Sequence, residues 1–502
     1  MPIKSEYPDV PVATEPFSGT FSHALWQHFS ENPHKPALIN AQNEQETVTF
    51  GEVILQGGAI TGANQQSTQY EIKQQLEDSR SQVVFCSNTN LTCVLEAVKQ
   101  NSRIKAVIVV GASLNDEYEN QQPHNPLVIS FNKVLHTEPA INKEKVKPNV
   151  DKDILILPYS SGTTGIPKGV MISHKNFGTM MNLLTNQFNT NVLPYIDKDF
   201  DYRKENQMLM LPFYHIYGFG MLINCLLNGS TGIILEKFEH QIFCKSIEKY
   251  KFRILMVVPP VLVWMAKSES ILKYDISSVQ LLFSGAAPAG KDLCQKLCSK
   301  FPSLKFIAQA YGMTELIVRK INSQLGDENF RLSDRGRSRK GMPGELHYRG
   351  PTIMMGYFNR PEATAETIDS EGWMKTGDVG YLDKDNFLYI IDRRKELIKV
   401  KGFQVAPAEL EDVLLSHPNI KDCAVIGVPD RFSGELPKAY VVKANENLNE
   451  QEVLDFIKDK LAYYKHLKGG VEFIEEIPKS PAGKILRRFL RDMHCQKNKS
   501  KL

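Results

Sequence analysis

The chain has 502 residues, of which 42% are hydrophobic and 23% are charged. A chain of this length is too long to fold around one ordinary hydrophobic core, so at least two domains are expected. The 60 basic and 57 acidic residues leave a net charge of +3, which gives no electrostatic reason to expect a nucleic acid or an anionic membrane as partner. The longest apolar stretch, residues 254–266, is shorter than a membrane span and contains Pro259 and Pro260, so no transmembrane segment is expected.

The cysteines and the N-terminus favour a reducing compartment. Eight cysteines are scattered without a C-x-x-C pair or a cysteine–histidine zinc spacing, so no structural metal is expected. Cys294 and Cys298 are spaced as neighbours on one helix face, but without a second pair nearby they are interpreted as buried or half-buried thiols. The first residues contain neither the apolar core of a signal peptide nor an Arg-rich presequence, so secretion and mitochondrial import are not expected.

Short β-branched runs alternate with helical patterns in the middle of the chain. Helices are expected at residues 175–186 and 240–250, and the strands are expected at residues 154–157, 207–211, 231–235, 254–258, 280–284 and 305–309. This alternation predicts an α/β domain with largely parallel sheets, in which ligand residues lie at the C-terminal ends of the strands.

The pattern changes twice towards the C-terminus. Residues 341–392 are rich in glycine, proline and short strands, such as 344–350 and 387–392, which is typical of a small β-rich subdomain. From residue 393 strands and helices alternate again, at residues 395–400, 407–416, 423–428, 438–442, 450–461 and 471–473. We therefore expect an α/β protein with a large N-terminal domain, residues 1–392, and a small mobile α+β lid domain, residues 393–502.

Residues 159–169 read Tyr-Ser-Ser-Gly-Thr-Thr-Gly-Ile-Pro-Lys-Gly and directly follow an expected strand. Glycines let backbone N–H groups approach an anion, hydroxyls donate further hydrogen bonds, and Lys168 adds a positive charge. The common P-loop requires Ser or Thr after the lysine, whereas Gly169 stands there. A Gly/Thr-rich turn without a ligand is the structural alternative; the composition favours a loop that binds a nucleotide polyphosphate.

The order Ser-Ser-Gly-Thr-Thr-Gly-x-Pro-Lys-Gly resembles the signature of the adenylate-forming superfamily, which contains acyl-CoA synthetases, 4-coumarate:CoA ligases and beetle luciferases. Matching motifs follow in the family's order, and the resemblance extends from residue 48 over nearly the whole chain. These motifs occupy residues 211–218, 284–288, 309–315, 373–378, 391–405 and 477–485. The resemblance implies that a carboxylate attacks the α-phosphate of ATP, which gives acyl-AMP and pyrophosphate, and that the thiol of CoA then displaces AMP.

The resemblance also implies a site for ATP and Mg²⁺. Tyr311 would stack on adenine, Thr314 would contact the AMP phosphate, Asp378 would accept from the ribose hydroxyls and Arg393 would reach ribose or phosphate. Glu315 would hold Mg²⁺, a hard dication that needs few protein carboxylates when it bridges phosphates. The implied nucleotide-binding residues are Ser160, Ser161, Gly162, Thr163, Thr164, Lys168, Ala286, Gln309, Ala310, Tyr311, Gly312, Thr314, Asp378 and Arg393.

Other implied residues serve the acid, the thiol and the lid. His215 and Tyr217 would border the acyl pocket, although a histidine among aromatics is ordinarily a core residue. Lys484 would enter the site during adenylation and bond the carboxylate and the α-phosphate, whereas a lysine in a Pro/Gly turn is ordinarily a surface residue. The remaining implied residues are Lys395 as the hinge, Lys399 for acyl transfer, and Lys237, Lys401, Gly402 and Gln404 at the CoA site. Without the resemblance, residues 391–405 would be interpreted as a solvent-exposed run of charged residues.

Two segments are shorter than in the family. After Val53 about forty residues are absent, enough for the helix, strand and helix of a βαβ unit, and their absence is expected to expose apolar surface. The segment 316–340 is also short, and its charged part, residues 331–340, is interpreted as a solvated loop.

The C-terminal residues Ser500, Lys501 and Leu502 form the tripeptide read by the peroxisomal import receptor, so a peroxisomal location is expected. The favoured interpretation is an ATP-dependent acyl-CoA ligase acting on a medium- or long-chain fatty acid or a related acid. A catalytically impaired paralogue or isoform that binds nucleotide or a partner without turnover is the alternative, and a luciferase-like oxygenase is a minor one.

Overall fold

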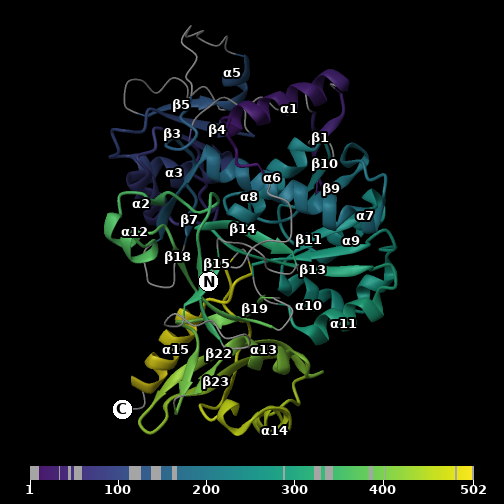
Figure 1. Ribbon diagram of the computed structural model, residues 1–502, viewed down its shortest axis with the longest axis vertical. Coiled ribbons are helices and arrows are strands. Elements are labelled where there is room, and N and C mark those ends of the chain that lie inside the picture. Colours follow the sequence, from purple (N-terminus) through teal and green to yellow (C-terminus); the bar gives the residue numbers. More distant parts are fainter. Residues whose placement is uncertain are drawn as a thin grey trace.

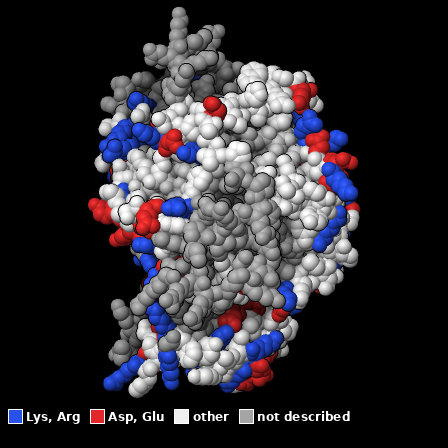
Figure 2. All heavy atoms as spheres, viewed as in Figure 1, with Lys and Arg blue, Asp and Glu red and all other residues white. Residues whose placement is uncertain are grey.

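The computed structural model describes residues 11–32, 34–42, 47–49, 59–111, 126–136, 148–160, 167–286, 289–321, 330–333, 343–383, 388–401, 403–480 and 483–499. The strands in this part of the chain form six sheets, with helices packed on their faces (Figure 1). No described helix has both the length and the apolarity to cross a membrane. On the face shown in Figure 2, basic and acidic side chains lie in small groups of both signs, as the near-balanced composition suggests.

Two mainly parallel sheets form the centre of the large N-terminal domain. The first has the order β2-β1-β10-β9 and the second the order β11-β12-β13-β14. β1, β10 and β9 are parallel, as are β11, β12 and β13, while β2 and β14 join them antiparallel. The strands are β1 (Pro36–Asn40), β2 (Thr47–Thr49), β9 (Asn206–Leu209), β10 (Thr231–Ile234), β11 (Ile254–Val257), β12 (Leu281–Ser284), β13 (Phe306–Met313) and β14 (Leu316–Ile321).

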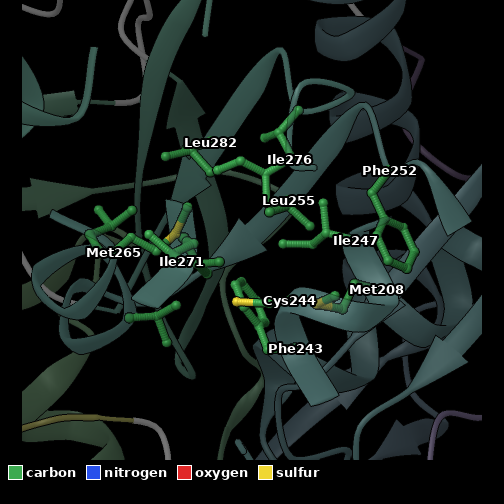
Figure 3. Close-up of a cluster of buried hydrophobic side chains, with 14 of the residues drawn as sticks. Met208, Phe243, Cys244, Ile247, Phe252, Leu255, Met265, Ile271, Ile276 and Leu282 are labelled. Atoms are coloured by element: carbon green, nitrogen blue, oxygen red, sulfur yellow. The ribbon is translucent and has the colours of Figure 1, made fainter. Parts of the chain in front are cut away.

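Helices cover these sheets and account for the continuous apolar runs in their strands, because parallel strands are buried on both faces. In α9, Phe243 and Ile247 lie four residues apart on one face and pack with Leu255 of β11 and Leu282 of β12 (Figure 3). The helices are α1 (Phe17–Glu31), α6 (His174–Asn191), α7 (Leu193–Ile196), α8 (Ile216–Leu227), α9 (His240–Tyr250), α10 (Pro259–Lys267) and α11 (Lys291–Lys300), with short 3₁₀ turns η2 (Tyr202–Lys204) and η3 (Ser270–Lys273).

A third parallel sheet lies at the N-terminal side, in the order β3-β4-β5. Its strands are β3 (Val83–Ser87), β4 (Ala106–Val110) and β5 (Leu127–Ser130), and its helices are α2 (Gln69–Ser79), α3 (Leu91–Val98) and α5 (Phe131–His136), with η1 (Asn88–Asn90). α2 and α3 bury Ile72 and Val94 against Val107 and Val109 of β4. In β3, by contrast, the side chains of Val83 and Phe85 are exposed.

The remaining sheets of the N-terminal part are antiparallel. One has the order β17-β8-β6, with β7 also on β8, and the other has the order β15-β16-β18-β19. Their elements are β6 (Ile154–Ile156), β7 (Tyr159–Ser160), β8 (Lys168–Ser173), β15 (Phe330–Ser333), β16 (Gly344–Tyr348), β17 (Gly356–Tyr357), β18 (Met374–Leu382), β19 (Leu388–Arg393) and α12 (Pro361–Thr367). The interpretation of residues 331–340 as loop was wrong for residues 331–333, because their backbone pairs with β16.

The C-terminal part contains one sheet of order β21-β20-β23-β22, with β24 on β23. The buried carboxylate of Glu411 in α13 accepts hydrogen bonds of 2.8 and 2.7 Å from Arg487, which joins α15 to α13. The elements are β20 (Ile398–Val400), β21 (Phe403–Val405), β22 (Ile420–Asp430), β23 (Gly434–Lys443), β24 (Val471–Phe473), α13 (Pro407–Leu415), α14 (Glu450–Lys460), α15 (Arg487–Lys499) and η4 (Tyr463–Lys465). The fold is thus α/β, with a large N-terminal domain of parallel sheets and a small β-rich C-terminal domain.

Candidate active site

The start of the expected phosphate loop lies against Glu315. Ser160 and Lys168 are paired across β7 and β8, so the backbone on both sides of the loop is fixed. The Ser160 hydroxyl donates a hydrogen bond of 2.7 Å to Oε1 of Glu315, which is only 5% exposed in the turn between β13 and β14. The loop residues Ser161, Gly162, Thr163 and Thr164 lie outside the described part of the chain.

An aromatic residue joins this pair to the loop lysine. The phenol of Tyr357 donates a hydrogen bond of 3.0 Å to the same Oε1 of Glu315. The Lys168 ammonium lies 4.7 Å from the centre of the Tyr357 ring, within cation–π distance. Ser160, Lys168, Glu315 and Tyr357 therefore form one cluster.

A second cluster contains Tyr311, Asp378 and Arg393. The Tyr311 hydroxyl donates a hydrogen bond of 2.6 Å to Oδ2 of Asp378, and Nε of Arg393 lies 3.6 Å from Oδ1. Asp378 and Arg393 face each other across β18 and β19. Burial raises the pKa of Asp378, and the Arg393 charge and the Tyr311 hydrogen bond oppose this rise. The ring, the carboxylate and the guanidinium expected at the nucleoside are thus brought together.

Lys484 belongs to the same group of charges. Its turn is closed by a bridge between Lys479 and Ile485, and Gly483 takes a φ of +79°, which a residue with a Cβ rarely adopts. Burial, and after it the Arg393 charge, lowers the pKa of Lys484 to about 8, against the opposing effect of Asp378 and Glu315. Lys484, from the C-terminal part of the chain, therefore lies near charged side chains of the first two clusters.

The expected acyl-pocket residues lie at the start of α8. His215 caps this helix, its Nδ1 accepting a hydrogen bond of 3.2 Å from the N–H of Tyr217. Burial, and after it the Lys484 charge, lowers the pKa of His215, so its ring is neutral at pH 7. The Tyr217 ring lies against Gly285, where an added Cβ would be 3.0 Å from Cε1. The Tyr217 hydroxyl is buried and has no hydrogen-bond partner among the described residues.

The segment beyond β12 is held in an unusual conformation. Ala286 has a φ of +71°, a backbone region that non-glycine residues rarely adopt and that is concentrated at functional sites. Gln309 exchanges two hydrogen bonds of 3.0 Å with the backbone of Ala289. Gln309 thus holds the backbone of Ala289. Ala310, Gly312 and Thr314 come after Gln309 along β13 and into the turn before Glu315.

Several predicted residues are not brought to these clusters. Lys237, Lys395, Lys399 and Lys401 are exposed, and the backbone N–H of Lys399 donates to Glu435. Gly402 and the side chain of Gln404 lie outside the described residues, as do Ser500, Lys501 and Leu502. Their roles at the hinge, the CoA site and the import receptor stay predictions.

Two sets of residues were missed in the sequence. Tyr357 follows an apolar run and resembles a core residue, so no local signal pointed to its contact with Glu315. Asp78, at the end of α2, accepts hydrogen bonds of 2.7 Å from the Tyr159 hydroxyl and 2.8 Å from Arg360. This network braces the residue that precedes Ser160, and nothing in its local sequence distinguishes Asp78 from a solvated helix residue.

The donor set fits a magnesium–nucleotide complex better than a metal held by protein alone. No cluster of three or more His, Cys, Asp or Glu side chains suited to a metal is found in the described part of the chain. One buried carboxylate, Glu315, accepts from two hydroxyls at Oε1, and Oε2 accepts no hydrogen bond from a described residue; Lys168 contacts the ring that carries one of these hydroxyls. Because Mg²⁺ keeps waters and binds through one or two carboxylates plus phosphates, this arrangement suits it.

Comparisons with known proteins agree with this chemistry. The AMP-binding enzyme family matches residues 47–358, and the AMP-binding enzyme C-terminal domain matches residues 409–484. 4-coumarate--CoA ligase 2 of Nicotiana tabacum is 38% identical over 93% of this chain and 93% of its own length. 4-coumarate:CoA ligase 1 of Petunia hybrida is 44% identical over 68% of this chain, and the match spans 65% of that enzyme.

Solved structures share the fold. The anthranilate CoA ligase AuaEII in complex with anthranoyl-AMP superposes with a TM-score of 0.79 at 23% identity, over 98% of this chain and 99% of its own. ATP-bound MatB from Rhodopseudomonas palustris superposes with a TM-score of 0.76 at 22% identity, over 94% and 99% of the two chains. The chain therefore belongs to the AMP-binding enzyme family, in the 4-coumarate:CoA ligase-like branch of the adenylate-forming superfamily, and is an AMP-forming acid–thiol ligase.

Proposed function

We propose that the protein activates a hydrophobic carboxylic acid as acyl-AMP and transfers the acyl group to CoA, and that the acid is a medium- or long-chain fatty acid or a related acid. The observation that carries the two-step reaction is the position of Lys484. This lysine comes from the C-terminal domain, yet its charge interacts with Asp378, Arg393 and Glu315 of the nucleotide clusters. A lysine brought in by a separate domain is suited to neutralise charge as the carboxylate attacks the α-phosphate.

The first step follows from the two clusters. Tyr311 and Asp378 hold the nucleoside, the ring by stacking and the carboxylate by accepting from ribose hydroxyls. Ser160 and Lys168 bind the phosphates that leave as pyrophosphate, and Lys484 neutralises the charge that develops at the α-phosphate. Glu315 would hold Mg²⁺, which would supply charge neutralisation at the phosphates. The chain contributes position and electrostatics, with no covalent intermediate on the protein.

The second step requires a different arrangement of the C-terminal domain. Lys399 and Lys401 are exposed, whereas the Lys484 charge interacts with Asp378, Arg393 and Glu315. A rotation at Lys395 would withdraw Lys484 and present Lys399 with Gly402 for acyl transfer, while Lys401, Gln404 and Lys237 would contact CoA. Such a hinge motion separates the two half-reactions in time.

Two acid classes have support. The C-terminal Ser500-Lys501-Leu502 supports a peroxisomal enzyme, bound by the import receptor and acting on fatty acids or their derivatives. The relatives named 4-coumarate ligases support a hydroxycinnamic acid as second candidate. The buried Tyr217 hydroxyl without a described partner is compatible with a polar group on that acid.

The test is a panel of fatty acids of increasing length and of hydroxycinnamic acids, each assayed for ATP–pyrophosphate exchange and for thioester formation. We expect exchange and thioester with fatty acids above about eight carbons, because apolar burial gains about 0.8 kcal/mol per CH₂. If the protein forms thioesters from hydroxycinnamic acids and from no fatty acid, the substrate belongs to the second acid class and the first is rejected. Absence of exchange with every acid, in folded protein, would show an impaired enzyme. Light emission from a supplied luciferyl-adenylate would reveal the oxygenase alternative.

A further inference from the structure

Tyr357 is held by the strand that carries the loop lysine. β17 pairs antiparallel with β8, with Tyr357 opposite Val170 and Gly356 opposite Met171. The N–H of Phe358 also donates to the carbonyl of Gly169, at 2.8 Å. The ring is therefore fixed relative to Lys168, which begins β8.

The phenol of Tyr357 is a fixed donor to Glu315. Tyr357 is 7% exposed and Glu315 is 5% exposed, so water competes little for their hydrogen bond. A tyrosine phenol is protonated at neutral pH, so Tyr357 can act as a donor to this carboxylate. With Ser160 donating to the same Oε1, two hydroxyls orient one carboxylate.

The same side chain also separates two opposite charges. Lys168 lies over the ring face, while Glu315 accepts from the hydroxyl at the ring edge. Within the described residues, Lys168 contacts the Tyr357 ring and forms no ion pair with Glu315, whose carboxylate accepts from Ser160 and Tyr357. A direct ion pair would neutralise both groups and withdraw them from phosphate and cation.

We propose that Tyr357 is a positioning residue for the adenylation step: it orients the Glu315 carboxylate and holds the Lys168 ammonium apart from it, so that both face the magnesium–pyrophosphate end of ATP. This inference rests on the proposed function. It assigns Tyr357 to the first half-reaction alone, because the second half-reaction, between acyl-AMP and CoA, involves neither pyrophosphate nor its magnesium ion.

The test substitutes Tyr357→Phe, which removes the hydroxyl and keeps the ring. We expect kcat/KM for ATP in pyrophosphate exchange to fall about tenfold, as for loss of a hydrogen bond to a charged group, and the Mg²⁺ concentration at half-maximal rate to rise. Thioester formation from supplied acyl-AMP and CoA should stay within about twofold of wild type. The matched control is Tyr440→Phe, which removes a buried hydroxyl that donates to the Leu490 carbonyl in the C-terminal domain.

Further variants test whether Tyr357 acts through Glu315. In a Glu315→Gln background, Tyr357→Phe should cost little more, because the oriented carboxylate is already gone. Equal losses in both half-reactions, or an unchanged Mg²⁺ requirement in Tyr357→Phe, would overturn the proposal. If the wild type shows no pyrophosphate exchange with any acid, the proposed function fails. Calorimetry then measures the affinity for ATP with and without Mg²⁺ in the wild type and in Tyr357→Phe. An equal gain in ATP affinity from Mg²⁺ in both proteins would overturn the inference.

Discussion

Lys484 has a pKa of about 8, so its charge changes within the pH range of ordinary assays. Burial is the first cause of this shift and the Arg393 charge the second, and both disfavour the protonated amine. Below pH 8 the amine is mostly charged, and above it mostly neutral. Because kcat/KM reports the ionisation of the free enzyme, the shift bears directly on the first half-reaction.

We predict that kcat/KM for ATP in pyrophosphate exchange falls as pH rises through about 8, because the lysine loses the charge that offsets the developing negative charge. Lys484→Gln should lose about a hundredfold in exchange and lose this alkaline limb. Thioester formation from supplied acyl-AMP is the internal control. An identical alkaline fall in both half-reactions, or in Lys484→Gln, would assign the limb to another group.

At the scale of elements, β3 is the least protected strand of its sheet. Within the described residues it is an edge strand, paired with β4 alone. Val83 is 45% and Phe85 59% exposed on one face, and Leu127 of β5 is 47% exposed. These side chains lie in the N-terminal part of the chain, where apolar exposure was expected from the short segment after Val53. Exposed, apolar edge strands are templates for pairing with other chains.

We predict concentration-dependent self-association that is reduced by Val83→Thr combined with Phe85→Thr, because threonine keeps β propensity while removing apolar surface. Sedimentation velocity over a range of concentrations measures this effect, and the unfolding free energy should change by less than about 0.5 kcal/mol. Phe432→Thr is the matched control, since Phe432 is 85% exposed and lies in the turn between β22 and β23. Equal self-association of the double variant and the wild type would show that the chains associate through another surface.

At the scale of the whole molecule, the C-terminal domain contacts the N-terminal domain along α10 and α11. Lys267 of α10 donates a hydrogen bond of 2.5 Å to the carbonyl of Ile420. A Cβ added to Gly290, before α11, would lie 1.6 Å from Oδ1 of Asp412 in α13. Gly290 has an ordinary φ of −65°, so its backbone tolerates other residues and only the approach of Asp412 requires glycine.

We predict that Gly290→Ala lowers the rate of pyrophosphate exchange by about fivefold, or about 1 kcal/mol, because Asp412 must move before the domain can present Lys484. Thioester formation from acyl-AMP, which needs the other arrangement, should be spared. Gly290→Ala combined with Asp412→Ala should recover exchange. Asp412→Ala alone shows whether the Asp412 carboxylate itself affects the rate of pyrophosphate exchange. A double variant no faster than Gly290→Ala would contradict a steric clash between the new Cβ and Asp412.

Much of the fold was predictable because local patterns carry it. Five strands of the central sheets, β9 to β13, begin within about one residue of their expected starts, since apolar β-branched runs are what a doubly covered parallel sheet requires, whereas β1 and β2 were not expected. The strands β14 and β15 were not expected from the sequence, because charged residues can form an edge strand through their backbone alone. β7 and β17 are only two residues long, too short for a periodic pattern.

The sequence by itself determined the chemical groups and their order: a hydroxyl- and glycine-rich loop, a Tyr-Gly-Met-Thr-Glu run, an aspartate, an arginine and a C-terminal lysine. Only the tertiary structure decided which of them meet. Ser160 and Glu315 are 155 positions apart and Tyr311 and Asp378 are 67 apart, yet each pair shares a hydrogen bond below 3 Å. Local patterns follow from the conformation of neighbouring residues, whereas hydrogen bonds and charge interactions depend on ångström distances that the packing of distant elements sets. Tyr357 was therefore assigned to the site only by its contacts.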